Sequence, residues 1–135
     1  AGDAVLRHLA RLLRQSLRDE DSVGRVGGEE FLLLLPDTSK PDAIGAAMRI
    51  RKRLAQYPCR FDGIELPVTL SMGIATSDEG LHLRDLIELA DRRLYAAKDA
   101  GRDRMVTEGF ADKTASDNAE RLVQGVERAL ETSEA

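Results

Sequence analysis

The chain has 135 residues and a mass of 14.8 kDa, a size that suits one domain with a single core. Its 42% hydrophobic and 33% charged residues are ordinary for a globular protein, and because aromatic residues make up only 4%, aliphatic side chains must fill the core. The net charge of −4 argues against binding of a nucleic acid polymer through a basic surface, so an anionic nucleotide would need local cations.

The first part of the chain predicts a helix followed by a hairpin. An apolar stripe at helical spacing indicates the helix and consists of Leu6, Leu9, Ala10, Leu13 and Leu17. A short strand over residues 22–26 then meets Gly27 and Gly28, a strong turn signal because glycine adopts positive φ without a Cβ clash. Residues 30–35 follow as a strand whose apolar run is typical of burial on both faces.

The middle of the chain predicts a second helix, a small hairpin and a further strand. The helix is expected over residues 41–56, and its inward side chains are expected to be Ile44, Ala47, Met48 and Leu54. A hairpin over 59–65 is centred on Asp62 and Gly63, a favourable two-residue turn. Alternating apolar residues predict a strand over 67–76.

The last part predicts a third helix over 83–100, a short strand over 104–107, a polar linker over 108–118 and a helical tail over 119–135. Gly101 is expected to cap the third helix. The inward residues of that helix are expected to be Leu83, Leu86, Ile87, Ala90, Leu94 and Ala97. One face of the tail is expected to carry Leu122, Val123, Val126 and Leu130. Alternating helices and strands indicate an α/β fold of the α+β sandwich type.

The glycine hairpin is the strongest chemical signal. It would bring Glu29 and Glu30 to the rim of a sheet, where adjacent carboxylates need a positive partner. A Mg²⁺ ion suits them, since Mg²⁺ is held by one or two carboxylates together with substrate phosphates. The missing side chains at Gly27 and Gly28 would also let a phosphate approach the backbone. The alternative is a plain hairpin with two solvated glutamates.

The run Gly27-Gly28-Glu29-Glu30-Phe31 resembles the signature of the diguanylate cyclase (GGDEF) family, and the resemblance extends from Ala1 to about Val106. It implies a palm-like nucleotidyl-cyclase sheet flanked by helices. It also implies that the family's first central strand, with its metal-binding aspartate, lies upstream of Ala1. The chain begins inside a predicted helix, so we expect a segment of a longer protein that is weak or inactive on its own.

The resemblance also implies roles for individual residues in substrate binding. Glu29 and Glu30 would bind Mg²⁺ or Mn²⁺, and Asp3 would accept hydrogen bonds from guanine. Lys98 and Arg102, predicted to lie one helical turn apart, would neutralise the nucleotide phosphates. Each has a structural alternative: Asp3 could be a helix N-cap, and the two cations could complement a helix dipole.

A second group of residues resembles the family's inhibitory product site. Arg18 and Asp21 match an Arg-x-x-Asp pattern, and Arg49 on the second helix is its third member. Arginine can pair with phosphate and stack on a purine. The alternative is a solvated charge run at a helix end. Arg25 is expected to contribute only peripherally or as an ordinary cross-strand residue.

The resemblance implies condensation of two GTP into cyclic di-GMP and two pyrophosphates, performed by an antiparallel homodimer under product feedback. A fused regulatory domain in the parent protein, which could be membrane-anchored, would assist dimerisation. We expect the domain itself to be cytoplasmic and without membrane contact, since no apolar run is long enough to span a bilayer. The alternatives are a non-catalytic module that senses cyclic di-GMP or GTP, and an adaptor for a following phosphodiesterase domain.

Three residues carry no chemical signal of their own. The lone Cys59 is expected to be a small apolar residue at a strand edge, because it has no internal disulfide partner. His8 and His82 share no metal-ligand spacing and are expected at the surface.

Overall fold

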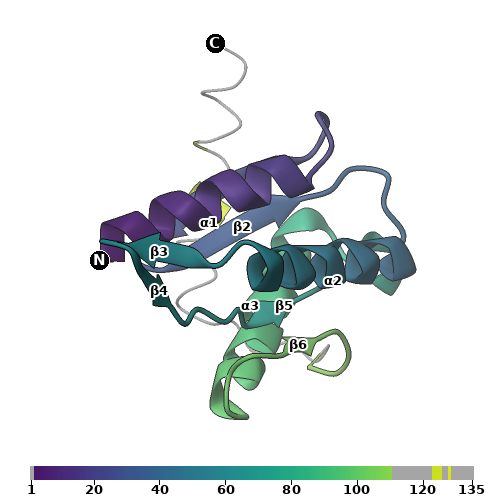
Figure 1. Cartoon of the computed structure of the whole chain (residues 1–135). Coiled ribbons are helices and arrows are strands. Elements are labelled where there is room, and N and C mark those ends of the chain that lie inside the picture. Colours follow the sequence, from purple (N-terminus) through teal and green to yellow (C-terminus); the bar gives the residue numbers. More distant parts are fainter. Residues whose placement is uncertain (1, 111–122, 126–127, 129–135) are drawn as a thin grey trace.

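The computed structural model describes residues 2–110, 123–125 and 128, and over these it is a mixed α and β structure (Figure 1). The elements in chain order are α1 (Gly2–Ser16), β1 (Ser22–Gly27), β2 (Glu30–Leu34), α2 (Lys40–Gln56), β3 (Cys59–Phe61), β4 (Ile64–Leu66), β5 (Met72–Gly73), the 3₁₀ turn η1 (Ser77–Glu79), α3 (Leu83–Asp99) and β6 (Met105–Val106). The predicted order of elements is therefore confirmed within the described residues.

The strands form three separate two-stranded sheets. β1 pairs with β2 and β3 with β4 as antiparallel hairpins, whereas β5 and β6 are parallel. The β3–β4 turn is formed by Asp62 (φ 53°) and Gly63 (φ 76°), as the sequence predicted. No described strand joins the three sheets, and sheets this small agree with a partial palm fold.

Two apolar clusters hold these pieces together on opposite faces of the β1–β2 hairpin. On one face, α1 and α2 pack against Val23, Phe31 and Leu33; the buried members are Leu9, Leu12, Leu13, Ile50 and Leu54. On the other face, Val26, Leu32 and Leu34 pack against Ile87 of α3 and against Val123. Successive side chains of a strand point to opposite faces, so the alternation along β2 decides which cluster each residue joins.

Several predicted burial positions are wrong. The residues of β2 are half-buried rather than strongly buried, because β1 is the one described strand that pairs with it. Met48 is 60% exposed, since it lies about 100° around the helix from the buried Ala47. Leu83 is 49% exposed, because it is the first residue of α3. The predicted strand over 67–76 is reduced to Met72–Gly73.

The helix boundaries follow the expected local signals. Ser39 caps α2, its hydroxyl accepting from the amide of Asp42 at 3.3 Å. Gly101 follows the end of α3 with φ 116°. Cys59 is buried at the start of β3, as predicted. No helix among the described residues combines the length and apolarity that crossing a membrane requires.

The predicted linker and tail lie mostly outside the described residues. Residues 108–110 are described and belong to no helix or strand, and residues 123–125 and 128 are helical. The expected positions of Leu122, Val126 and Leu130 on one tail face fall outside the described part of the chain.

Candidate functional site

The tip of the β1–β2 hairpin is a tight turn made by Gly28 and Glu29. The strand register pairs Arg25 with Phe31 and Gly27 with Glu30, so the turn has two residues. Gly28 has φ 51°, a conformation that residues with a side chain rarely adopt. The Nε of Arg25 donates to the carbonyl oxygen of Gly28 at 2.9 Å. Arg25 therefore stabilises the turn, a more specific role than the sequence indicated.

The turn presents its two carboxylates differently. Glu29 is exposed, whereas Glu30 begins β2 and is half-buried. The Nζ of Lys98 on α3 lies 3.3 Å from the Oε1 of Glu30, and the two side chains are 32% and 27% exposed. This ion pair joins residues that are 68 positions apart in the sequence. It brings one predicted phosphate-binding cation to the predicted metal-binding hairpin.

The donor set at the hairpin is small for a metal site. Within the described residues, no group of three or more His, Cys, Asp or Glu side chains could hold a metal ion. Two carboxylates are still enough for Mg²⁺ or Mn²⁺ when substrate phosphates and water complete an octahedral shell. Glu29 and Glu30 thus fit a metal that binds together with its nucleotide, rather than one held by protein ligands alone.

An open pocket of about 370 Å³ lies between α1 and the β1–β2 hairpin. Asp3 and Arg7 line it from α1, and Gly24, Arg25 and Phe31 line it from the hairpin. Asp3 lies inside the first turn of α1, so it is not the N-cap residue. Sequence reasoning missed Arg7; the signal was its position four residues after Asp3, which puts both on one helix face.

Arg102 is not where the sequence predicted. Gly101 ends α3, and Arg102 follows in the left-handed region with φ 64°, so Lys98 and Arg102 do not share one helical face. Its amide donates to the carbonyl of Ala97 at 2.9 Å, and its side chain is exposed. No hydrogen bond within the described residues joins the Arg102 side chain to the hairpin.

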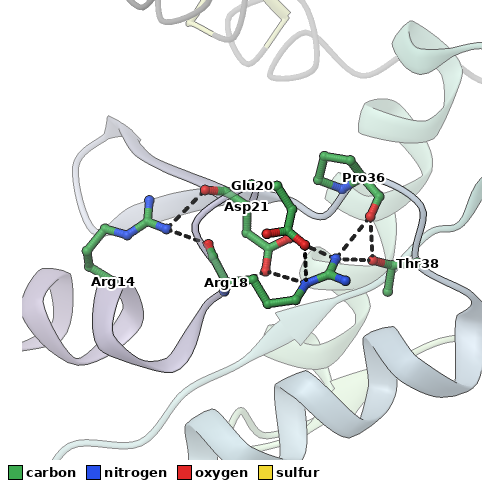
Figure 2. A network of polar contacts seen from close by, with 6 residues as sticks. All are labelled: Arg14, Arg18, Glu20, Asp21, Pro36 and Thr38. Atoms are coloured by element: carbon green, nitrogen blue, oxygen red, sulfur yellow. Dashed lines mark hydrogen bonds and ion pairs between the residues drawn. The ribbon is translucent and has the colours of Figure 1, made fainter.

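Arg18 and Asp21 form a separate network at the end of α1 (Figure 2). Asp21 is 4% exposed and accepts three hydrogen bonds from Arg18: from its amide at 2.9 Å, from Nε at 3.3 Å and from Nη2 at 3.1 Å. Burial would raise the pKa of Asp21, but the hydrogen bonds from Arg18 outweigh burial and lower it. The hydrogen bond to Asp21 likewise raises the pKa of Arg18.

The same network fixes the Arg18 guanidinium against the loop before α2. Its Nη2 also donates to the carbonyl of Pro36 at 3.0 Å and to Oγ1 of Thr38 at 2.8 Å. Arg14, which sequence reasoning missed, donates to the carbonyls of Arg18 and Asp21 at 2.9 and 3.0 Å (Figure 2). The Arg18 side chain remains half exposed, and no described residue accepts from its Nη1. Oε1 of Glu20 also lies 3.4 Å from the Arg18 Nε, so Arg18 is held by two carboxylates and by the loop while half of its side chain stays exposed (Figure 2).

The remaining predicted residues lie apart from both sites. Arg49 is exposed on α2, and its Nη1 lies 3.8 Å from the place a Cβ would take at Gly45, so the side chain runs back along the helix. Within the described residues, no hydrogen bond or ion pair joins Arg49 to Arg18 or Asp21. His82 is exposed at the N-cap of α3, and Nε2 of the half-buried His8 lies 2.7 Å from the carbonyl of Tyr57.

Comparison with known proteins gives a consistent result. The family model described as "Diguanylate cyclase, GGDEF domain" matches residues 1–104. Diguanylate cyclase A of Treponema denticola is 37% identical over 106 residues, which cover 78% of this chain and 29% of that protein. Diguanylate cyclase DgcP of Pseudomonas aeruginosa is 45% identical over 106 residues, covering 78% and 16%. The chain therefore spans less than a third of these relatives.

Solved structures match as well. A GGDEF-domain-only form of TpbB (YfiN) from Pseudomonas aeruginosa superposes with a TM-score of 0.65 at 33% identity, covering 92% of this chain and 69% of that one. The active GGEEF domain of a diguanylate cyclase from Vibrio cholerae gives a TM-score of 0.61 at 30% identity, covering 83% and 69%.

Proposed function

Because this chain belongs to the diguanylate cyclase GGDEF-domain family, we propose that its hairpin site takes part in condensing two GTP into cyclic di-GMP and two pyrophosphates. The observation that carries the proposal is the contact between Lys98 and Glu30 at 3.3 Å. It gathers a phosphate-binding cation, two carboxylates and a glycine turn at one place. That combination suits a nucleoside triphosphate better than an uncharged ligand.

Each residue then has a defined task. Glu29 and Glu30 would hold Mg²⁺ or Mn²⁺, which when bound neutralises charge on the reacting phosphate. Asp3 would accept hydrogen bonds from guanine in the pocket beside α1. Lys98 would exchange its contact with Glu30 for one with a substrate phosphate, and Arg102 would join it through its exposed side chain.

The proposed reaction needs two copies of the domain. One hairpin site offers carboxylates for a single nucleotide, and the 3′-hydroxyl of each GTP must attack the α-phosphate of the other. An antiparallel homodimer of half-sites satisfies this requirement, and a fused regulatory domain in the longer protein would bring the halves together. A cytoplasmic location, where GTP is available, belongs to the same proposal.

Product feedback through Arg18, Asp21 and Arg49 is the second part of the proposal. The half-exposed Arg18 guanidinium is already fixed by Asp21, Pro36 and Thr38, so binding a phosphate or purine there would cost little ordering entropy. Asp21 is buried, and this supports a role in orienting Arg18. Arg49 would supply a further cation after its side chain turns away from Gly45.

The experiment is to incubate the protein with GTP and Mg²⁺ and to measure cyclic di-GMP and pyrophosphate. Among the described residues no group of three metal ligands is found, so the metal would be held only together with its nucleotide, and we expect weak turnover or none from residues 1–135 alone. The longer protein should be active and should lose turnover on Glu30→Gln. Robust synthesis by residues 1–135 would contradict the expected weakness, and an inactive longer protein would contradict the proposal.

A sensing module remains the alternative, since the Arg18 network stands apart from the hairpin. Calorimetry with cyclic di-GMP separates the two functions. If the longer protein shows no turnover but binds cyclic di-GMP, and Arg18→Ala removes this binding, the sensor is favoured. If the longer protein both binds cyclic di-GMP and turns over GTP, the cyclase is favoured.

A further inference from the structure

A β-bulge lies immediately before the turn that carries the carboxylates. The register of β1 and β2 shifts between Arg25 and Gly27, so Val26 has no opposite partner in β2. Bulges increase local twist and re-aim the chain that follows them. The position of Val26 therefore affects the direction in which Glu29 and Glu30 leave the sheet.

Residues 123–125 pack against this bulge from the face opposite α1. Val123 is 6% exposed and belongs to the cluster that contains Val26, Leu32 and Ile87. A Cβ at Gly125 would lie 3.4 Å from Cγ1 of Val26 and 3.8 Å from its Cβ, which is ordinary contact distance, so a side chain longer than a methyl group that points this way would meet Val26. The described parts of this segment are drawn in yellow in Figure 1.

We propose that Val123 and Gly125 are positioning residues for the Glu29–Glu30 turn, and that they act through Val26. Val123 packs on the apolar face of the hairpin, and the glycine at position 125 leaves room beside the Val26 side chain at the bulge. A one-ångström displacement of a reacting group can cost about a hundredfold in rate. The consequence for catalysis rests on the proposed function; the control of hairpin geometry does not.

The proposed contact would make the Glu29–Glu30 turn sensitive to the position of Val123 and Gly125. The β1–β2 hairpin is covered on one face by α1 and on the other by Ile87 of α3 and Val123. A displacement of Val123 or Gly125 would therefore change the position of Val26, and through Val26 the position of the two carboxylates. Any element attached there could adjust the two carboxylates without touching the nucleotide.

The test compares backbone amide NMR signals of the whole 135-residue chain in three variants. Gly125→Leu should shift the amides of residues 27–30, because its side chain must displace Val26. Gln124→Leu is the matched control, since Gln124 is exposed beside the same contact. Leucine favours a helix more than glycine does, so Gly125→Leu should not unwind the segment.

A rescue variant distinguishes positioning from general disturbance. Val26→Ala combined with Gly125→Leu removes the methyl groups that the new side chain meets, and the amides of residues 28–30 should return toward their original signals. The proposal is overturned if Gly125→Leu changes only signals near residue 125, or if Gln124→Leu moves the hairpin equally. If Gly125→Leu detaches residues 123–125 from the hairpin, the amide signals of residues 27–30 should still change. Unchanged signals in that case would also overturn the proposal.

A second measurement tests whether the contact of Val123 and Gly125 with Val26 affects nucleotide binding. Calorimetry with GTP and Mg²⁺ should show binding weakened by about tenfold in Gly125→Leu, equal to about 1.4 kcal/mol, and unchanged in Gln124→Leu. If residues 1–135 bind no GTP, the same comparison is made in the longer protein, where absent GTP binding would overturn the proposed function, while the amide signals still decide whether residues 123–125 position the hairpin.

Discussion

A buried ion pair between Arg93 and Glu79 ties α3 to the chain before and after it. Arg93 is 1% exposed, and its Nη2 lies 2.6 Å from Oε1 of Glu79. Its Nη1 donates to Oε2 of Glu79 at 3.0 Å and to the carbonyl of Ile74 at 2.6 Å, and its Nε donates to the carbonyl of Gly109 at 3.1 Å. Replacing Arg93 with methionine keeps most of the volume and removes all four bonds.

The loss of stability in Arg93→Met depends on the groups that Arg93 would leave without a partner. Glu79 would lose its cation, although its side chain is 18% exposed and could recruit water. Breaking a buried pair by removing one partner costs about 3–5 kcal/mol. Because water can partly reach Glu79, we expect Arg93→Met to lose about 3 kcal/mol of stability, the lower end of this range. For a domain of this size this corresponds to a fall in Tm of roughly 10–15 °C. Arg93→Met combined with Glu79→Leu should recover part of the loss, since the buried charge is then gone.

The pH dependence of this loss has a definite sign. The hydrogen bond from Arg93 holds the pKa of Glu79 below its ordinary value near 4.5, although burial opposes it. A lowered folded-state pKa contributes stability that is present above the unfolded pKa and disappears as the pH falls through the folded pKa. The stability difference between the original protein and Arg93→Met should therefore be complete at pH 7 and shrink below about pH 4.5.

Urea unfolding at pH 7 and pH 4, followed by circular dichroism, measures these differences. Lys52→Met is the matched control, because Lys52 is an exposed cation on α2 and should change stability by no more than about 0.5 kcal/mol. The reasoning is refuted if Arg93→Met costs less than about 1 kcal/mol, or if the effects of Arg93→Met and Glu79→Leu simply add.

Three further substitutions test other contacts. Gly73→Ala should destabilise by at least the 1–3 kcal/mol typical of overpacking, because a Cβ there would overlap backbone atoms of α3; Gly24→Ala, where a Cβ meets nothing within 4 Å, should be nearly neutral in the same urea experiment. Lys98→Ala should lower stability by less than about 1 kcal/mol yet abolish GTP binding by calorimetry, and unchanged binding would count against the proposed phosphate contact. Asp21→Asn should lower Tm at pH 7, with the difference fading as the pH falls below 3.8, because Asp21 has a lowered pKa in the folded state; a constant difference down to pH 2 would contradict this assignment.

The parts of the fold that depend on neighbouring residues could be predicted from the sequence. The turn at Gly28, the cap at Ser39 and the end of α3 at Gly101 each depend on a conformation or hydrogen bond within a few residues. Glycine and serine supply these features wherever they stand, so local chemistry was sufficient.

Apolar alternation over residues 67–76 indicated burial but not strand pairing. Val68, Leu70 and Met72 do pack against the cluster under α1 and α2, yet within the described part of the chain only Met72 and Gly73 have a partner strand. Alternation reports which face of an extended chain is covered. Hydrogen bonding needs a second strand at the right distance, and no local pattern supplies that information.

Contacts between distant residues could not be predicted. Arg93 lies on the inward face of α3, where periodicity alone would place an apolar residue, and its burial depends on Glu79 and on two backbone carbonyls. A basic residue four positions from both Leu89 and Ala97 was the available signal, because residues four apart share one helix face. The partner could be identified only after the fold brought η1 to the helix.

The candidate site is assembled by helices packed on separate small sheets rather than by one continuous sheet. The carboxylates stand on the β1–β2 hairpin, Asp3 comes from α1, and Lys98 comes from α3, which packs on β5 and β6. The distances from the carboxylates to Asp3 and Lys98 therefore depend on the positions of α1 and α3 relative to the hairpin, and not on the register of one continuous sheet. Substitutions that move α3, at Gly73 or Arg93, should then reduce nucleotide binding even though neither residue lies at the hairpin, because Lys98 moves with its helix while Glu30 does not.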